Sequence, residues 1–190
     1  PAFEALFTID EETGMTGAFE LEQGILDGTI LLNLDTEDDD EFSIGCAGGI
    51  DINTSYSYTE EYPSSNDLGF KITVKGLKGG HSGMDINLER GNANKIMNRL
   101  IHNNAVYGLH IAEMNGGSLR NEIPRESFAT VIVNDEDYLI EFKKRVSEIK
   151  AEFSISDAGL NIIIESCEIP SKVMSITDTK KVTNAIYAVH

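Results

Sequence analysis

Hydrophobic and polar residues follow different periods in the first and second parts of the chain. Up to residue 50, the apolar residues come in short, nearly unbroken runs that end in polar residues or glycine. Such runs are typical of strands covered on both faces in a parallel sheet. They predict strands over Ala5–Ile9, Thr29–Leu34 and Ile44–Ile50, and Thr16–Gln23 has the pattern of a short helix before Gly24.

The pattern changes to strict alternation after Asp51. Ile52, Thr54, Tyr56 and Tyr58 alternate with polar residues. This period of two predicts a strand with one exposed face, and therefore a new structural neighbourhood. We place a domain boundary near Asp51.

From Gly69 onward, strand and helix patterns follow one another in the order βαββαβ. The expected elements are strands over Phe70–Val74, Leu109–Met114, Ser127–Val133 and Leu160–Ser166, and helices over about 88–105 and over Glu136–Phe153. The second helix carries one apolar stripe at three- and four-residue steps, formed by Leu139, Phe142, Val146, Ile149 and Phe153. The order βαββαβ is that of the split ferredoxin-like sandwich, in which both helices lie on one face of the sheet.

The sequence therefore predicts an α/β chain in three parts. Residues 1–50 form part of a domain with a parallel-type sheet, residues 51–175 form the βαββαβ unit that Pro170 closes, and residues 176–190 begin a further helix. The chain starts at Pro1 without a methionine and stops at His190 inside a helical pattern. We expect a segment of a longer protein, and the question of an upstream export signal stays open.

Composition narrows the classes of partner. The chain has 15 basic and 32 acidic residues and a net charge of -17, which repels a phosphate backbone and excludes nucleic acid. No run of about 18 apolar residues occurs, so no membrane span is expected. The two cysteines, Cys46 and Cys167, lie far apart and outside any metal-ligand spacing, which favours a reducing, cytoplasmic compartment. Cations or positively charged substrates are the favoured partners.

Carboxylates follow two of the predicted strands directly. Asp10, Glu11 and Glu12 come after the first strand, and Asp35 ends the second. Burying an unpaired carboxylate costs several kcal/mol, so these groups need a solvated turn, a basic partner or a cation. In open α/β sheets, ligands bind at this edge of the strands. The acidic strand ends are therefore candidate ligand-binding residues.

The acidic run after Asp35 has the charge of a calcium loop but not its pattern. Counted from Asp35, an EF-hand loop needs glycine at its sixth position and glutamate at its twelfth, where this chain has Asp40 and Cys46. We therefore interpret residues 37–41 as a solvated acidic loop.

Two glycine-containing loops of the second part carry candidate functional groups. The loop over residues 75–83 lacks both the Gly-Lys-Ser/Thr ending and the Gly-x-Gly-x-x-Gly run of phosphate-binding loops. It does place His81 between glycines, which permit close backbone approach. The loop over residues 115–125 is polar and ends near a rigid proline, and by itself it is equally explained as a long connection between strands. His102, His110 and His190 are interpreted as surface or core histidines.

Taken together, these residues resemble the aminoacyl-histidine dipeptidases. These enzymes are the carnosinase-like branch of the dinuclear zinc metallopeptidases, which also include carboxypeptidase G and succinyl-diaminopimelate desuccinylase. The resemblance covers essentially the whole chain. It is carried by the motifs Phe7–Gly14, Leu32–Glu37, Gly79–Gly83, Arg90–Ala93 and Asn121–Pro124.

The resemblance implies a role for five residues. Glu11 matches the general base of the family, Glu12 a ligand of one zinc ion and Asp35 a ligand of the other. His81 matches a lid histidine that, in dimeric relatives, reaches the active site of the other subunit and stabilises the tetrahedral oxyanion. Asn121 matches a lid asparagine that contacts substrate. The βαββαβ unit then corresponds to the lid through which a homodimer forms, and the complete enzyme is expected to use two zinc ions on dipeptides of the Xaa-His type.

The chain lacks the other metal-binding motifs of the family. The His-x-Asp motif, the bridging aspartate and the last histidine ligand are all missing from these residues, and two carboxylates do not make a catalytic zinc centre. We therefore expect this segment to be inactive by itself. Two alternatives stay open, namely a non-catalytic lid and dimerisation module, and another aminoacylase or carboxypeptidase of the same family.

Overall fold

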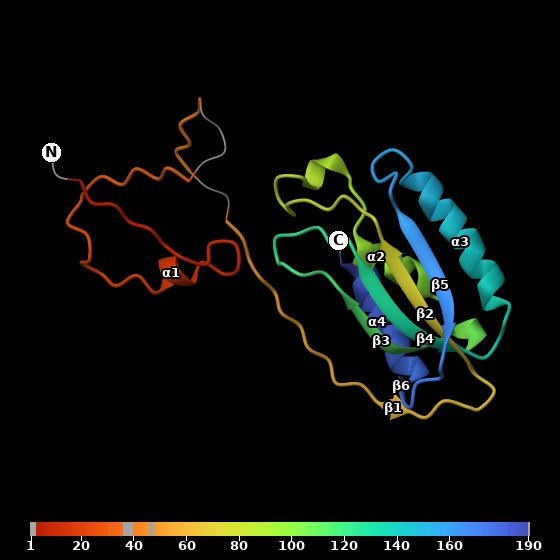
Figure 1. The fold of residues 1–190 in the computed structure, drawn as a ribbon. Helices are drawn as coiled ribbons and strands as arrows, with labels where there is room; N and C mark the ends of the chain where they lie inside the picture. The colour runs from red at the N-terminus through yellow and green to blue at the C-terminus, as the bar shows by residue number, and fades with distance from the viewer. Residues whose placement is uncertain (1–2, 36–39, 46–47, 190) are drawn as a thin grey trace. The chain divides into compact units, whose positions relative to one another are not determined.

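The structure is a computed structural model that describes residues 3–35, 40–45 and 48–189. The chain divides into two compact units, Pro1–Tyr56 and Ser57–His190 (Figure 1). The three domain ranges expected from the sequence stay predictions.

The first unit contains only one short helix among its described residues, α1 over Thr16–Phe19. The strands predicted over Ala5–Ile9 and Thr29–Leu34 are wrong, and the described part of the chain forms no parallel sheet. The strand predicted over Ile44–Ile50 includes residues 46 and 47, which lie outside the described residues, and the rest of that range is not a strand either.

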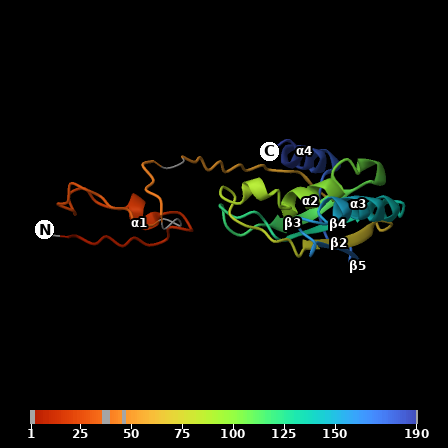
Figure 2. The same ribbon diagram turned by 90° about the horizontal axis from the view of Figure 1, so that it is seen from above.

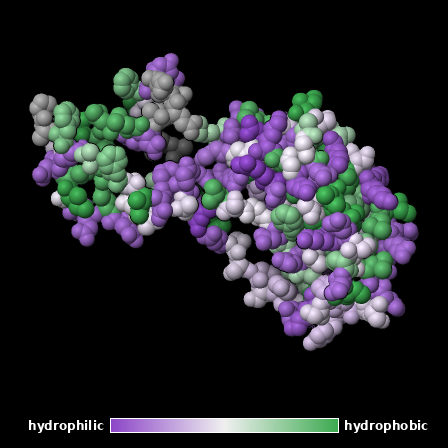
Figure 3. Space-filling model, in the orientation of Figure 1, coloured by the Kyte–Doolittle hydropathy of each residue, from purple (hydrophilic) through white to green (hydrophobic). Residues whose placement is uncertain are grey.

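The missing strands have a simple physical cause. A strand that is apolar on both faces needs apolar partners on both sides. Here Leu31 and Leu32 are 79% and 74% exposed, and every buried apolar residue of the described chain belongs to the second unit. Figure 3 shows apolar side chains at the surface of the first unit. The runs are as apolar as predicted, but their described side chains stay exposed.

The second unit is built on a four-stranded antiparallel sheet in the order β3-β4-β2-β5. Its strands are β2 (Leu68–Lys75), β3 (His110–Gly116), β4 (Ser127–Val133) and β5 (Asn161–Cys167), and its two covering helices are α2 (Ala93–Ile101) and α3 (Tyr138–Glu152). The chain order β2-α2-β3-β4-α3-β5 is the predicted βαββαβ, and this strand order is that of the ferredoxin-like sandwich.

The core lies between the sheet and the two helices. Phe70, Ile72 and Val74 alternate along β2 toward the helices and are buried, as the period of a strand requires. They belong to one cluster with residues of both helices: Ile96, Met97, Leu100, Phe142 and Ile149. Figure 2 shows α2 and α3 on the same side of the sheet.

Helix α2 is shorter than the sequence predicted. The Asn92 side chain accepts hydrogen bonds from the backbone of Asn94 and Lys95, so the helix begins at Ala93. Residues Ile86–Leu88 form a separate 3-10 turn, and Asn103 has a φ of 61°, which takes the chain out of the helix.

A second, smaller sheet and a last helix flank this sandwich. Strand β1 (Glu60–Glu61) pairs with β6 (Val173–Met174). The strand predicted over residues 52–58 is wrong, because only Glu60 and Glu61 find a partner strand there. Helix α4 (Ile176–Ala188) fits the helix expected after residue 176 and packs against α2. None of the described helices is long and apolar enough to cross a membrane.

Candidate functional site

The loop that carries His81 is joined to the loop that carries Asn121. His81 and Glu122 form an isolated antiparallel bridge. On either side of it, the Ser82 backbone donates to the carbonyl oxygen of Asn121 over 2.7 Å, and the Ile123 backbone donates to that of Gly80 over 2.8 Å. The structure therefore brings two of the five predicted site residues to the same end of the second unit.

The hydrogen bonds of His81 define how its ring can act. The side chain is exposed, and its Nδ1 accepts hydrogen bonds from the backbone N–H groups of Gly83 and Met84 at 3.0 and 3.2 Å. A ring nitrogen can accept these bonds only when it carries no proton, so the neutral ring carries its hydrogen on Nε2. His81 is thereby prepared as a hydrogen-bond donor through Nε2.

An ion pair holds the backbone around His81. The Asp85 carboxylate accepts a hydrogen bond from the His81 backbone at 3.0 Å and lies 3.5 Å from the guanidinium of Arg90. Arg90 in turn donates to the carbonyl oxygen of Gly79 over 2.6 Å. The backbone on both sides of Gly80 is thus fastened by two side chains of the same loop.

Asp157 lies outside this loop in the sequence and holds the loop through two hydrogen bonds. Asp157 is 1% exposed, and its carboxylate accepts hydrogen bonds from the backbone N–H groups of Lys78 and Gly91, each over 2.8 Å. Burial is the largest single effect and raises the pKa of Asp157, but the backbone hydrogen bonds from Lys78 and Gly91, the Ser156 side chain and the charge of Lys78 together hold the pKa below its usual value. The group is therefore a buried carboxylate that stays ionised near neutral pH.

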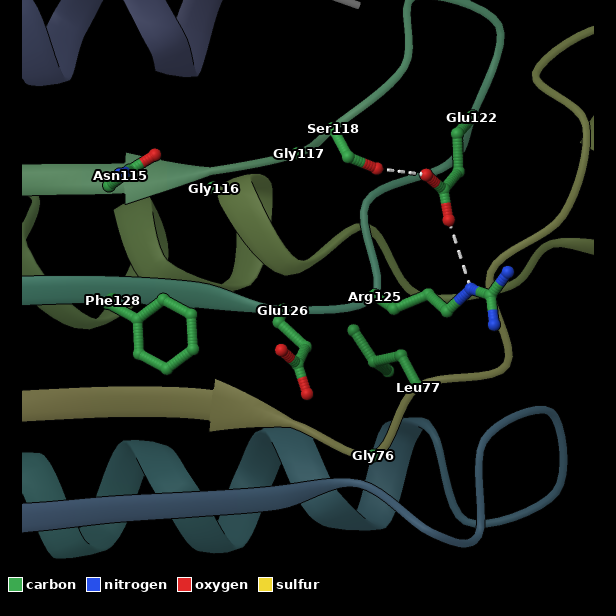
Figure 4. Close-up of a pocket in the computed structure, with 10 residues that line it drawn as sticks. All are labelled: Gly76, Leu77, Asn115, Gly116, Gly117, Ser118, Glu122, Arg125, Glu126 and Phe128. Atoms are coloured by element: carbon green, nitrogen blue, oxygen red, sulfur yellow. Dashed lines mark hydrogen bonds and ion pairs between the residues drawn. The ribbon is translucent and has the colours of Figure 1, made fainter.

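A pocket of about 480 Å³ opens beside the paired loops (Figure 4). Glu122 points into it and accepts hydrogen bonds from Ser118 Oγ at 2.5 Å and from Arg125 Nε at 3.0 Å. The hydrogen bond from Ser118, supported by Arg125, lowers the pKa of Glu122 despite partial burial. Leu77 and Phe128 supply apolar wall, so the pocket combines a fixed charge pair with an apolar surface.

The acidic residues of the first unit lie in exposed, locally stabilised loops. Glu11 and Glu12 belong to a turn in which the Gly14 and Met15 backbones donate to the carbonyl oxygen of Asp10 at 3.1 and 2.6 Å. Asp35 is exposed, and its backbone donates to Asn33 Oδ1 over 3.0 Å.

These carboxylates do not build a metal centre by themselves. Across residues 3–35, 40–45 and 48–189, no group of three or more His, Cys, Asp or Glu side chains is arranged to hold an ion. Protein zinc sites use three or four side-chain ligands, and Glu12 and Asp35 supply only two. Glu12 and Asp35 therefore do not make up a zinc site by themselves, and the roles of Glu11, Glu12 and Asp35 stay predictions.

Comparison with known proteins identifies the class of the second unit. Residues 72–158 match the peptidase dimerisation domain of the M20 type. This range begins inside β2 and ends just before β5, so it includes both helices and both loops of the candidate site. The second unit contains a peptidase dimerisation domain.

Two relatives extend the similarity beyond this domain. The chain is 41% identical over 167 residues to the cytosol non-specific dipeptidase of Escherichia coli (strain K12), and the match covers 86% of the chain and 34% of that protein. It is 40% identical to the aminoacylhistidine dipeptidase of Vibrio alginolyticus, whose crystal structure matches 95% of the chain with a TM-score of 0.74 and is covered to 38%. The chain thus spans about a third of the length of these relatives. The resemblance is confirmed: the chain is related to the M20 dipeptidases.

The sequence did not reveal the residues that support the loop. Asp157 accepts hydrogen bonds from Gly91 and Lys78, which lie 66 and 79 positions away along the chain. No local sequence pattern encodes such a pairing. Its place between Ser156 and Gly159 indicates a turn, which was the only available signal.

Proposed function

We propose that this chain is part of a zinc-dependent dipeptidase that hydrolyses Xaa-His dipeptides, and that its second unit pairs two subunits. The observation that carries the proposal is the pairing of the His81 and Asn121 loops, which leaves His81 Nε2 as a donor at an exposed end of the dimerisation domain. The names of the two relatives support a dipeptide substrate, and that of the E. coli protein supports a cytoplasmic location.

His81 is proposed as the donor to the oxyanion that forms when the peptide carbonyl is attacked. A donor that is already oriented costs no reorganisation during the reaction, and its loss typically lowers kcat by about a hundredfold or more. The two backbone N–H groups on Nδ1 provide that orientation. Asn121 is proposed to contact the substrate beside it.

Glu11 is proposed as the general base, and Glu12 and Asp35 as ligands of two zinc ions whose other ligands are separate from these residues. A base is needed only for proton transfer, whereas a ligand is needed for the metal site to exist. Glu11→Gln in the complete protein should therefore abolish turnover and keep the zinc content, whereas Glu12→Gln should lower both. Metal analysis of the purified variants checks this, and equal zinc loss in both would reverse the assignment.

The favoured alternative is a dimerisation module without catalysis, since the described carboxylates form no metal centre by themselves. Another aminoacylase or carboxypeptidase activity of the family is a further alternative. Assay of the complete protein on carnosine, on dipeptides without histidine and on N-acyl amino acids separates the three. Turnover only of the last group would replace the Xaa-His assignment, and no turnover at all would favour the module.

Action across the dimer has a specific test. In a twofold dimer, a His81→Ala chain paired with a Glu11→Gln chain has one site with an intact base and the partner's intact histidine. Random mixing makes half the dimers mixed with one working site each, so about a quarter of wild-type activity should return from two nearly inactive parents.

The experiment refolds the two complete, differently tagged variants together and confirms mixing by tag selection. His102→Ala is the matched control, because His102 bonds Asn184 and stacks on Tyr187 away from the two loops. This variant should keep wild-type kcat. Mixed dimers that stay as inactive as the parents would refute action across the interface.

A further inference from the structure

One buried carboxylate closes the loop that presents His81. The loop leaves the end of β2, carries His81, and returns at Gly91 just before the start of α2. Asp157 Oδ1 accepts the Lys78 N–H at its beginning, and Oδ2 accepts the Gly91 N–H at its end. Both ends of residues 78–91 are therefore held by the same side chain.

Asp157 is itself fixed in place. It follows α3, where its backbone N–H donates to the Phe153 carbonyl oxygen at 2.9 Å and its own carbonyl accepts from Leu160, just before β5, also at 2.9 Å. Hydrogen bonds to an ionised acceptor are roughly twice as strong as those between neutral groups. The loop is therefore attached to the α3–β5 turn, which belongs to the packed sandwich.

We propose that Asp157 is a positioning residue for His81, which fixes where the histidine stands by clamping both ends of its loop. The inference rests on the proposed role of His81. The physical reason is that a catalytic group must stand in the correct place, since a misplacement of about 1 Å can lower the rate roughly a hundredfold. The Asp157 carboxylate bonds the backbone of Lys78 and Gly91 at the two ends of the loop, so it would act through the backbone of residues 78–91.

Asp157→Asn is the sharpest variant, because it keeps the size of the side chain. The amide has one acceptor oxygen, so one of the two N–H groups loses its partner and faces an NH₂ group instead. In the complete protein, kcat on the dipeptide should fall by about tenfold or more, with KM changed by less than about threefold, as expected for an interaction made only in the transition state.

The matched control is another buried carboxylate of the same unit. Asp178 is 5% exposed, and it accepts the Thr59 backbone N–H at 2.9 Å while bonding Ser175 at the start of α4. Asp178→Asn also removes a buried carboxylate but does not involve the His81 loop. It should lower the melting temperature without lowering kcat by more than about twofold, since its partners lie outside residues 78–91.

Two further measurements separate positioning from general stability. In a His81→Ala background, Asp157→Asn should change kcat by less than about twofold, because residues that act as one unit are not additive. Hydrogen exchange of the backbone N–H groups over residues 78–91 should speed up by about tenfold or more in Asp157→Asn, while exchange in β2 and β4 stays slow.

The outcomes are distinct. A kcat loss that is the same with and without His81, or loop exchange at the wild-type rate, would overturn the positioning role. Full activity of His81→Ala would overturn the proposed function of His81, and loop exchange would still decide whether Asp157 clamps the loop. Asp157→Ser repeats the test if the Asn variant fails to fold. If both fail, Asp157 serves overall stability and the inference is wrong.

Discussion

Two glycines cross so closely at the end of β2 that a single methyl group there should be costly. Gly76 has a φ of +82°, and a Cβ built on it would lie 2.2 Å from the carbonyl oxygen of Gly159, whereas real Cβ atoms essentially never come closer than 3.0 Å. A Cβ on Gly159 would lie 2.8 Å from the Gly76 carbonyl oxygen. Because both obstacles are backbone atoms, neither can rotate away.

Gly76→Ala combines two costs, that of a left-handed backbone and that of a steric overlap, and two other glycines measure each cost separately. Gly117 has the same φ of +82°, but a Cβ there would meet nothing nearer than Pro124 at 3.5 Å, so Gly117→Ala carries only the cost of left-handed backbone. That cost is about 1–2 kcal/mol. Gly159 has no such φ, so Gly159→Ala carries only the overlap, about 1–3 kcal/mol by analogy with overpacked cores. Gly76→Ala carries both and should lose about 2–5 kcal/mol.

Urea unfolding of the 190-residue chain measures these differences. The chain contains no tryptophan, so far-UV circular dichroism is the suitable signal. Gly76→Ala should have the lowest midpoint of the three variants, at an unchanged slope with urea. If Gly76→Ala is no less stable than Gly117→Ala, the close crossing of the two backbones does not exist in solution.

Three further predictions concern capping and charge. Asn92→Ala removes the cap that bonds the backbones of Asn94 and Lys95, and urea unfolding should show a loss of about 1 kcal/mol. Lys95→Met removes the ammonium that donates to the last carbonyl groups of α4, including that of Ile186 at 2.9 Å, and hydrogen exchange at the end of α4 should speed up. Asp157 has a lowered pKa in the folded state, so its contribution is present above the unfolded pKa of about 3.9 and is lost as pH falls through the folded value. The stability difference between wild type and Asp157→Asn, measured by urea unfolding, should therefore be largest near pH 7 and shrink below about pH 4.

The four strands of the main sheet were predictable because the pattern that indicates each strand lies within its own residues. In β4, Ala129, Val131 and Val133 are buried on one side, and the predicted range Ser127–Val133 is the observed one. The two-residue strands β1 and β6 carry no such pattern. They exist because Glu60 and Glu61 meet Val173 and Met174 from a distant part of the chain, and such a pairing leaves no local signature.

The candidate site also has one part that the sequence indicated and another part that it did not. The residue types around His81 marked a loop that permits close backbone approach, and this was visible in the sequence. The sequence did not show that this loop pairs with residues 121–123, or that a carboxylate from the α3–β5 turn closes it. Both features depend on the sheet bringing the ends of β2, β3 and β5 together, which is a property of the whole unit.

The failed strand predictions of the first unit show what an apolar run reports. A run such as residues 29–34 indicates a segment that gains free energy from burial, at roughly 25 cal/mol for each Å² of apolar surface removed from water. The run does not tell which other elements pack against that segment. Ile30, Leu31 and Leu32 are at least 74% exposed in this structure, so the described chain does not meet that demand. A strand prediction from such a run is therefore conditional on apolar neighbours on both faces, which the run itself cannot specify.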